Sequence, residues 1–255
     1  MTTKYILAIS GNDIFSGGGL YADLATYTVN NLHGFVAVTC LTALTDKGFE
    51  VFATDSTVFS HQLNSLRDVP FSGIKLGLLP NGDIARQALE FVKAHADIPV
   101  VLDPVLVCKE SHDTEVSVLR KELLKFFPYV KIITPNLTEA ELLIGKKIGN
   151  LEEMKEAAQA LCDLGAKTVV IKGGNRLSKD RAIDVFYDGQ DFQILDYPIL
   201  EHNNIGAGCT FVSSIASQLV LGKTANEAVR EAKAFVYHAI EQSNDYGVKQ
   251  NYDRS

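Results

Sequence analysis

Short apolar runs alternate with segments of helical periodicity along most of the chain. Apolar, often β-branched runs that end in turn residues predict buried strands at 5–9, 35–41, 73–78, 100–102, 131–134 and 168–171. Between them, apolar residues recur at helical spacing or follow helix-capping residues, which predicts helices at 20–32, 56–69, 83–96, 114–127, from 136 onward and at 150–164. This alternation predicts an α/β fold with a mostly parallel central sheet and helices on both faces.

The last third of the chain departs from this pattern. Runs at 182–187 and 191–195 flank Asp188-Gly189-Gln190, which is typical of a hairpin. A glycine turn then leads into an apolar helix at 211–221, and a capping box at 224–227 begins a helix that reaches about residue 242. Because no linker or repeat divides the chain, we expect a single domain over residues 1–255.

Composition narrows the classes of function. Hydrophobic residues make up 46% and charged residues 22%, as in ordinary globular proteins, and the net charge of −7 gives no general attraction to nucleic acid. No apolar run approaches the roughly 20 residues of a membrane span. The four cysteines show no CxxC spacing and no signal peptide precedes them, which favours a reduced, cytoplasmic location. An anionic small molecule would therefore need a local binding site.

The stretch from Gly206 to Thr210 is the best candidate for such a site. Two glycines feed directly into a helix, whose first amide groups point outward at the positive end of the helix dipole. Cys209 lies in this first turn, so we expect the pKa of its thiol to fall. The alternative is a glycine-rich turn with a half-buried cysteine.

Polar residues also follow several of the predicted strands. In a parallel sheet such residues meet at one edge, where ligands bind. They are Asp13, Asp103, Asn136, Glu139 and Lys172. Each has a simpler interpretation as well, because Asn136 and Glu139 can merely cap a helix and a lysine at a strand end is commonly solvated. The first glycine loop, at 17–19, lacks the G-x-G-x-x-G spacing of a dinucleotide site.

Taken together, five segments resemble the ribokinase superfamily, in the branch of hydroxymethylpyrimidine phosphate kinases and bacterial pyridoxal kinases. The segments are GGGLYAD (17–23), DPVLVCK (103–109), TPNLTEAE (134–141), IKGG (171–174) and GAGCTF (206–211). The resemblance implies a ribokinase-like fold, ATP as phosphoryl donor, Mg²⁺ as cofactor, a vitamin precursor with a hydroxymethyl group as acceptor, and a homodimer.

The resemblance also implies roles for individual residues. Lys172 would lie beside the transferred phosphates and Cys209 would act as base, where most of the superfamily has aspartate. The expected ATP-phosphate site comprises Gly206, Ala207, Gly208, Thr210, Gly173 and Asn136. Glu139 and Asp103 are the expected metal ligands, with Asn136 helping to organise the ion. The expected substrate contacts are Asp13, Gly19, Asp23 and Leu44, although Asp23 alone would be read as part of a solvated helix face.

Two positions distinguish the possible substrates. Leu44 occupies the place of a glutamine that contacts the pyrimidine in pyrimidine kinases, and leucine cannot read that edge by hydrogen bonds. Cys108 lies in a Val-Cys-Lys segment typical of the pyridoxal kinases, and its thiol could add to the pyridoxal aldehyde. Both favour phosphorylation of pyridoxal, pyridoxine or pyridoxamine. A hydroxymethylpyrimidine kinase remains the alternative, and a non-catalytic vitamin-binding protein is a third interpretation because Cys209 replaces the usual base.

Overall fold

The computed structural model describes residues 3–106 and 113–251, with the side chains of 113–115 left aside. Its strands are β1 (Tyr5–Asn12), β2 (His33–Thr45), β3 (Gly48–Ala53), β4 (Phe71–Leu76), β5 (Val100–Leu102), β6 (Ile132–Ile133), β7 (Val169–Lys172), β8 (Arg181–Tyr187) and β9 (Phe192–Pro198). Its helices are α1 (Gly19–Val29), α2 (Ser56–Ser65), α3 (Gly82–Lys93), α4 (Asp113–Leu124), α5 (Leu137–Ile144), α6 (Leu151–Asp163), α7 (Ala207–Val220) and α8 (Ala225–Glu241).

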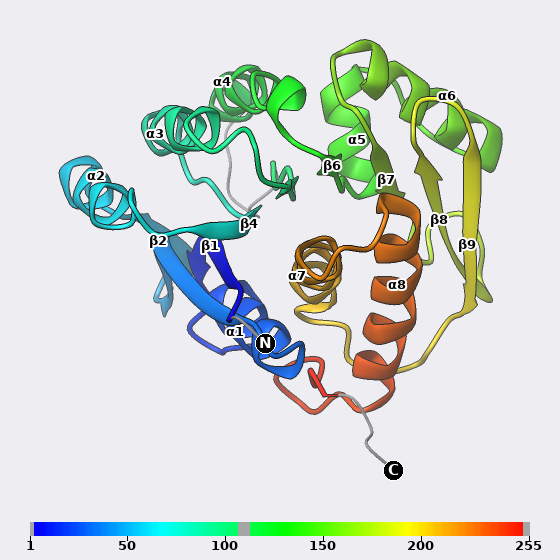
Figure 1. Ribbon diagram of the computed structural model, residues 1–255. Helices are drawn as coiled ribbons and strands as arrows, with labels where there is room; N and C mark the ends of the chain where they lie inside the picture. Colours follow the sequence, from blue (N-terminus) through cyan, green and yellow to red (C-terminus); the bar gives the residue numbers. More distant parts are fainter. Residues whose placement is uncertain (1–2, 107–112, 252–255) are drawn as a thin grey trace.

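The strands of the described residues form one sheet in the order β3-β2-β1-β4-β5-β6-β7-β8-β9 (Figure 1). The strands from β2 to β7 in this order run parallel, whereas β3, β8 and β9 pair antiparallel at the two edges. The predicted mostly parallel sheet is therefore confirmed. Because parallel strands end at the same edge, their following loops converge there.

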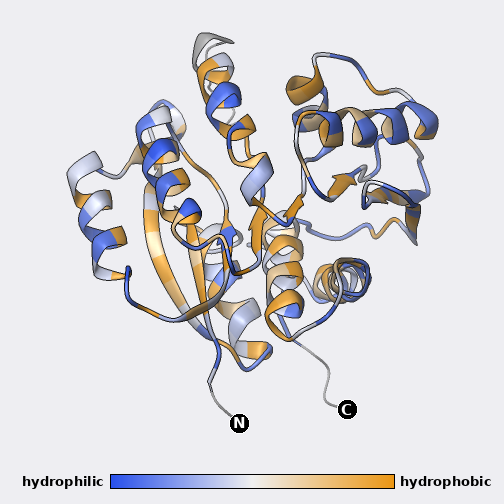
Figure 2. Ribbon diagram, turned by 45° about the horizontal axis from the view of Figure 1, so that its top comes forward, coloured by the Kyte–Doolittle hydropathy of each residue, from blue (hydrophilic) through white to orange (hydrophobic). Residues whose placement is uncertain are grey.

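Helices cover both faces of the sheet, as predicted. One apolar core packs residues of α2, α3, α4, α5 and α6 against the sheet, and the other packs α1, α7 and α8 against the opposite face. Figure 2 shows the strands largely hydrophobic and the outer helix surfaces largely hydrophilic. No helix in the described ranges is long and apolar enough to cross a membrane.

The helix starts follow from capping side chains. Asn150 accepts a hydrogen bond from the Glu153 amide at the start of α6, and Thr224 forms a full capping box with Glu227 at the start of α8. Both caps agree with the sequence analysis. The hairpin at 188–190 is also confirmed, with Gly189 at φ +96°, a conformation that favours glycine.

The sequence pattern missed one strand. Residues 48–53 form β3, which pairs antiparallel with a β2 longer than predicted. The turn between them contains Asp46 and Lys47, and Gly48 has φ +111°. On β3, Phe49 and Phe52 are exposed. An edge strand with exposed apolar residues lacks the buried run by which the other strands were predicted.

Candidate active site

The loops that follow β1, β5, β6 and β7 meet the start of α7 at one edge of the sheet. Asp103 comes directly after β5, Asn136 lies between β6 and α5, and Lys172 ends β7. The backbone of Asn136 bridges to that of Lys172, and the side chain of Lys172 reaches Asp103. The predicted convergence of strand-end residues is present in the structure.

The first glycine loop and the turn before α7 form a joint wall of this site. The Gly19 amide donates a hydrogen bond to Sγ of Cys209 over 3.3 Å. Asp13 shapes the same loop, because its carboxylate accepts from the amides of Phe15 and Gly18 at 3.1 and 2.9 Å. Gly206 has φ +82°, and a side chain there would overlap the carbonyl oxygen of Gly17. Glycine is required at position 206 by both conformation and space.

Helix α7 begins at this wall and presents its first amide groups to the site. The amides of Ala207 and Thr210 bond to the carbonyls of Asn204 and Gly206, so the predicted role of these two residues in binding phosphate stays a prediction. The amides of Gly208 and Cys209 remain as the first-turn donors without an intrahelical acceptor. The ammonium of Lys172 lies 3.8 Å from the point where a side chain at Gly208 would begin.

Lys172 is also part of a buried acidic cluster. Its ammonium bonds to Asp103 at 2.8 Å, and Thr134 donates to the same carboxylate oxygen. Glu139 lies close enough to this pair to interact electrostatically. Burial raises the pKa of Glu139 to about 7, Lys172 opposes this rise, and Asp103 adds to it. Two carboxylates therefore share one nearby ammonium group.

Asn136 and Glu139 form a capping box at the start of α5. The Asn136 side chain accepts from the Glu139 amide at 2.9 Å, and Glu139 Oε2 accepts from the Asn136 amide at 2.8 Å. The simpler interpretation of these two residues is thus correct. The capping box does not exclude that the two residues also bind a ligand. Glu139 uses only one carboxylate oxygen in the capping box, and Asn136 lines the neighbouring cavity.

The expected fall in the pKa of Cys209 is wrong. Burial raises the pKa of this thiol, and Asp23 and Asp103 raise it further, whereas Lys75 and the hydrogen bond from Gly19 lower it. The thiol lies at the start of α7 as predicted, but desolvation outweighs the lowering effects of Lys75 and of the Gly19 amide on its pKa.

Asp23 does not occupy the position expected of it. Its side chain is fully buried, so neither a solvated helix face nor a direct substrate contact fits this structure. Its two oxygens accept from the ammonium of Lys75 at 2.8 and 2.9 Å, and Ser213 donates to one of them at 2.5 Å. Sequence reasoning missed Lys75 and Ser213, because an isolated lysine in a strand and a serine in an apolar helix carry no local signal.

The two residues that were expected to distinguish the substrates are Leu44 and Cys108. Leu44 lies in the β2–β3 hairpin and is 66% exposed. The same hairpin reaches the first loop, because Thr42 Oγ1 accepts from the amide of Ile14 at 3.0 Å. A substrate contact by Leu44 stays a prediction. Cys108 lies outside the residues that the structure describes.

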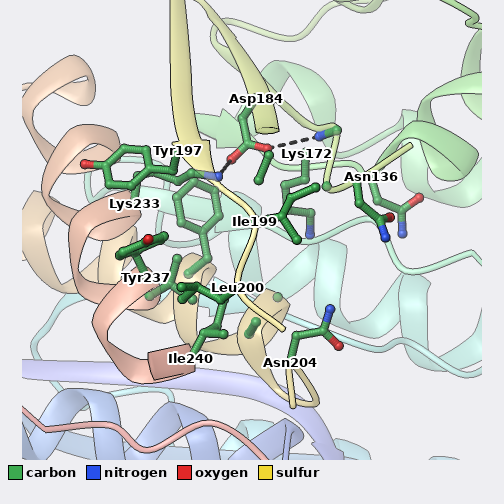
Figure 3. A pocket seen from close by; sticks show the side chains of 18 of the residues that line it. Asn136, Lys172, Asp184, Tyr197, Ile199, Leu200, Asn204, Lys233, Tyr237 and Ile240 are labelled. Carbon is green, nitrogen blue, oxygen red and sulfur yellow. Dashed lines mark hydrogen bonds and ion pairs between the residues drawn. The ribbon is translucent and has the colours of Figure 1, made fainter. Parts of the chain in front are cut away.

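A cavity of about 630 Å³ opens beside Lys172 and Gly208. At its polar end lie Asn136, Lys172, Gly173 and Gly174, and its other walls come from β8, β9 and their connection to α7, and from α7 and α8 themselves. Figure 3 shows the side chains around it: Asp184, Tyr197, Ile199, Leu200, Asn204, Lys233, Tyr237 and Ile240. The sequence analysis found the polar end together with Ala207 and Gly208 at the start of α7, and it missed the other lining residues because they look like ordinary strand and helix positions.

Comparisons with known proteins agree with this geometry. A "Pyridoxine kinase" of Bacillus subtilis is 34% identical over 253 residues, which is 95% of this chain and 92% of that protein. The structure of the pyridoxal kinase from Staphylococcus aureus in complex with AMP-PCP and pyridoxal matches with a TM-score of 0.91 and 35% identity, over 100% of this chain and 96% of that one.

A phosphomethylpyrimidine kinase from Clostridium difficile matches less well, with a TM-score of 0.78 and 30% identity over 93% of this chain and all of the other. The expected ribokinase-like fold is confirmed by these likenesses. The model of the phosphomethylpyrimidine kinase family matches residues 13–253. The chain therefore belongs to the phosphomethylpyrimidine kinase family.

Proposed function

We propose that this protein is an ATP-dependent kinase that phosphorylates the 5′-hydroxymethyl group of pyridoxal and related vitamers. The observation that carries the proposal is the full-length likeness, at a TM-score of 0.91, to a kinase bound to AMP-PCP and pyridoxal. The lower TM-score of 0.78 with the phosphomethylpyrimidine kinase supports pyridoxal over the pyrimidine.

The cavity beside Lys172 suits ATP. Its polar end offers an ammonium group, the Gly173–Gly174 turn and the first-turn amides of α7, which are the groups that phosphates select. Its other end is lined by apolar and aromatic side chains such as Ile199, Leu200 and Tyr237, against which a base can pack. We infer that the phosphates lie toward Lys172 and the base toward α8.

The donor set fits Mg²⁺ bound together with ATP. The described residues hold no cluster of three or more histidine, cysteine or acidic side chains that could bind a metal on its own. Asp103 and Glu139 are two carboxylates with one neighbouring ammonium, Lys172. Mg²⁺ commonly takes one or two carboxylates and completes its shell with water and phosphates. Bound there, it would neutralise phosphate charge during transfer.

Different residues of the site would stabilise the transferred phosphoryl group, bind the vitamin and remove the proton of its hydroxymethyl group. Lys172 and the amides of Gly208 and Cys209 would stabilise the charge that develops on the transferred group. The first loop, ordered by Asp13 and by the contact of Gly19 with Cys209, would form the side on which the vitamin binds. Cys209 is the candidate base for the hydroxymethyl proton. Because burial raises the pKa of its thiol, Cys209 must first release its own proton to water, and the resulting thiolate would then accept the hydroxymethyl proton.

Variants of Cys209 test this role. Cys209→Ala should remove most activity while the protein melts normally, and Cys209→Asp should restore part of it, because aspartate serves as base elsewhere in the superfamily that the sequence resembles. A fully active alanine variant would leave the backbone amides as the functional part of the turn and would exclude a chemical role for the thiol.

One coupled assay tests the substrate. The rate of ADP release is compared for pyridoxal, pyridoxine and hydroxymethylpyrimidine in the presence of ATP and Mg²⁺. We expect the highest kcat/KM with a vitamin B6 form. A higher value with the pyrimidine would replace the proposal by the thiamine-pathway alternative, and binding without turnover of any of the three would favour a vitamin-binding protein. We also propose that the protein is a homodimer with a cytoplasmic location. Sedimentation in the analytical ultracentrifuge would give the mass of the assembly in solution and so test the homodimer.

A further inference from the structure

The carboxylate of Asp184 joins two separate walls of the cavity. From its place on β8, one oxygen accepts from the amide of Gly173 at 3.0 Å and the other from the ammonium of Lys233 at 2.6 Å. Figure 3 shows the carboxylate of Asp184 joined by a dashed line to Lys233. Lys233 belongs to α8, whereas Gly173 begins the turn after β7. A single carboxylate thus ties α8 to the glycine turn at the polar end of the cavity.

The ion pair between Asp184 and Lys233 is buried. Because of this burial, a contribution to the stability of the fold is a weak explanation for its presence. Asp184 is 4% exposed and Lys233 8% exposed. Removing two charges from water offsets much of their attraction, and apolar residues often replace such pairs without loss of stability. An apolar pair could not accept a hydrogen bond from the Gly173 amide, and it could not hold α8 at a fixed distance from Gly173 through directed hydrogen bonds.

The position of Gly173 determines the position of Lys172. The Lys172 amide bonds to the carbonyl of Pro135 at 2.8 Å and the next amide, that of Gly173, bonds to Asp184. A side chain at Gly173 would overlap the carbonyl oxygen of Ile183, so the turn lies directly against β8. A shift of Gly173 would therefore displace the ammonium of Lys172 relative to Asp103 and Gly208.

The ammonium of Lys233 also faces the other end of the cavity. It lies 5.7 Å from the ring centre of Tyr197, and the rings of Tyr197 and Tyr237 contact each other with centres 5.1 Å apart. Both tyrosines line the cavity. The same lysine thus connects the aromatic wall with the carboxylate that holds the phosphate-side turn.

We propose that the Asp184–Lys233 pair is a positioning element for ATP. It holds the Gly173–Gly174 turn, and through it Lys172, at the place where the ATP phosphates bind, and it fixes the distance from this turn to α8. Neither side chain takes part in phosphoryl transfer itself. The proposal rests on the binding of ATP in this cavity and adds the residues that shape it.

The test compares Asp184→Asn, Lys233→Met and the double variant in steady-state kinetics and in calorimetric binding of ATP. Asparagine offers one acceptor oxygen where aspartate serves two donors. Loss of a charge-assisted hydrogen bond predicts that each single variant raises the KM and Kd for ATP about tenfold, with the KM for pyridoxal within about twofold of wild type. Because the two residues act as one unit, the double variant should be no worse than the worse single variant.

Lys233→Arg should recover much of the affinity for ATP, because it keeps the charge. The matched control is Lys223→Met, which removes an exposed ion pair with Glu231 near the start of the same helix and should change neither KM.

Three results would overturn the proposal: an unchanged KM for ATP with a lower melting temperature, an equal rise in both KM values, or effects that add in the double variant. If the single variants do not fold, the double variant decides alone, since it leaves no unpaired buried charge. Calorimetry with ATP separates this test from the proposed function, because it does not depend on which vitamin is phosphorylated.

Discussion

The Gly19 amide bonds to Sγ of Cys209 across 3.3 Å, although 190 residues separate them in the chain. One helical turn further on, Ser213 of α7 donates to Asp23 of α1 at 2.5 Å. The two helices are therefore joined at successive turns, and Lys75 lies beneath the second contact, bonded to Asp23. Because of these contacts, the first glycine loop (17–19) and the turn that begins α7 are held together in the free protein.

The first prediction concerns the reactivity of Cys209. Burial raises the pKa of its thiol above that of an ordinary cysteine, so the thiol is protonated at neutral pH. The reactive thiolate should therefore form only in alkaline solution. The rate of alkylation of Cys209 by iodoacetamide, followed by mass spectrometry of the peptide, should still increase between pH 8.5 and 10. A rate that levels off below pH 8 would show a low pKa and restore the original expectation.

The second prediction concerns Lys172. Lys172→Ala removes the ammonium beside Gly208 and Asp103, and should lower kcat by roughly 10²–10³, the scale of losing one charge-stabilising group. The KM for pyridoxal should change much less. Lys93→Ala, which removes a lysine on the surface of α3, is the control and should leave kcat unchanged. Turnover of Lys172→Ala within a few-fold of wild type would exclude Lys172 from the mechanism.

The third prediction rests on the sequence alone, because Cys108 lies outside the described residues. If its thiol adds reversibly to an aldehyde, it contributes only with pyridoxal. Cys108→Ala should then lower kcat/KM for pyridoxal and leave the value for pyridoxine nearly unchanged. The ratio of the two values in wild type and variant is the measurement, and an unchanged ratio would mean that Cys108 only fills space.

The fourth prediction concerns stability at low pH. Glu141 is buried, which opposes its ionisation, but hydrogen bonds from Arg176, the Ile148 amide and Lys147 lower its pKa to about 2. Since the ordinary pKa is higher, this carboxylate stabilises the folded state above about pH 4.5, and the contribution, up to about 3 kcal/mol, is lost as the pH falls toward 2.

The measurement is the difference in unfolding free energy between wild type and Glu141→Gln from pH 7 down to 3.5. It should narrow below about pH 4.5. Glu156→Gln, which removes an exposed pair with Lys146, should give a small difference at every pH. If the difference in unfolding free energy between wild type and Glu141→Gln does not change with pH, the ionisation of Glu141 does not contribute to the stability of the fold.

The sequence predicts those parts of the fold and site that depend on local patterns. Strand ends, glycine turns and caps are local features, and so the meeting of Asp103, Asn136 and Lys172 at one edge could be foreseen. Burial is a property of the whole fold. For this reason the pKa of Cys209 was expected to fall when it rises, and Asp23 was expected at the surface or the substrate when it is paired inside with Lys75.

The same reasoning explains which cavity residues were missed. Asp184 and Lys233 lie 49 positions apart, on an edge-side strand and a terminal helix, and neither forms part of a short motif. Only the antiparallel pairing of β8 with β7 and the packing of α8 bring them beside Gly173. Anion-binding turns are recognisable from sequence because the backbone makes them, whereas the side chains that hold such turns in place come from distant segments.

The last prediction separates conformation from close contact at Gly206. Gly206 and Gly145 both have positive φ, +82° and +74°, so an added side chain strains either position. At Gly145 nothing lies within 4 Å of the new atom, whereas at Gly206 it would overlap the carbonyl oxygen of Gly17. Gly145→Ala should therefore cost about 1 kcal/mol of stability and leave the kinase active.

Gly206→Ala has to push the first loop away from α7 as well. This shift breaks the alignment of Gly19 with Cys209 and moves the amides of Gly208 and Cys209, so kcat/KM should fall on the order of 10²-fold. Activity and unfolding free energy are measured for both variants. Equal activity in the two would show that the contact between the first loop and the α7 turn is dispensable, and that the turn binds phosphate without it.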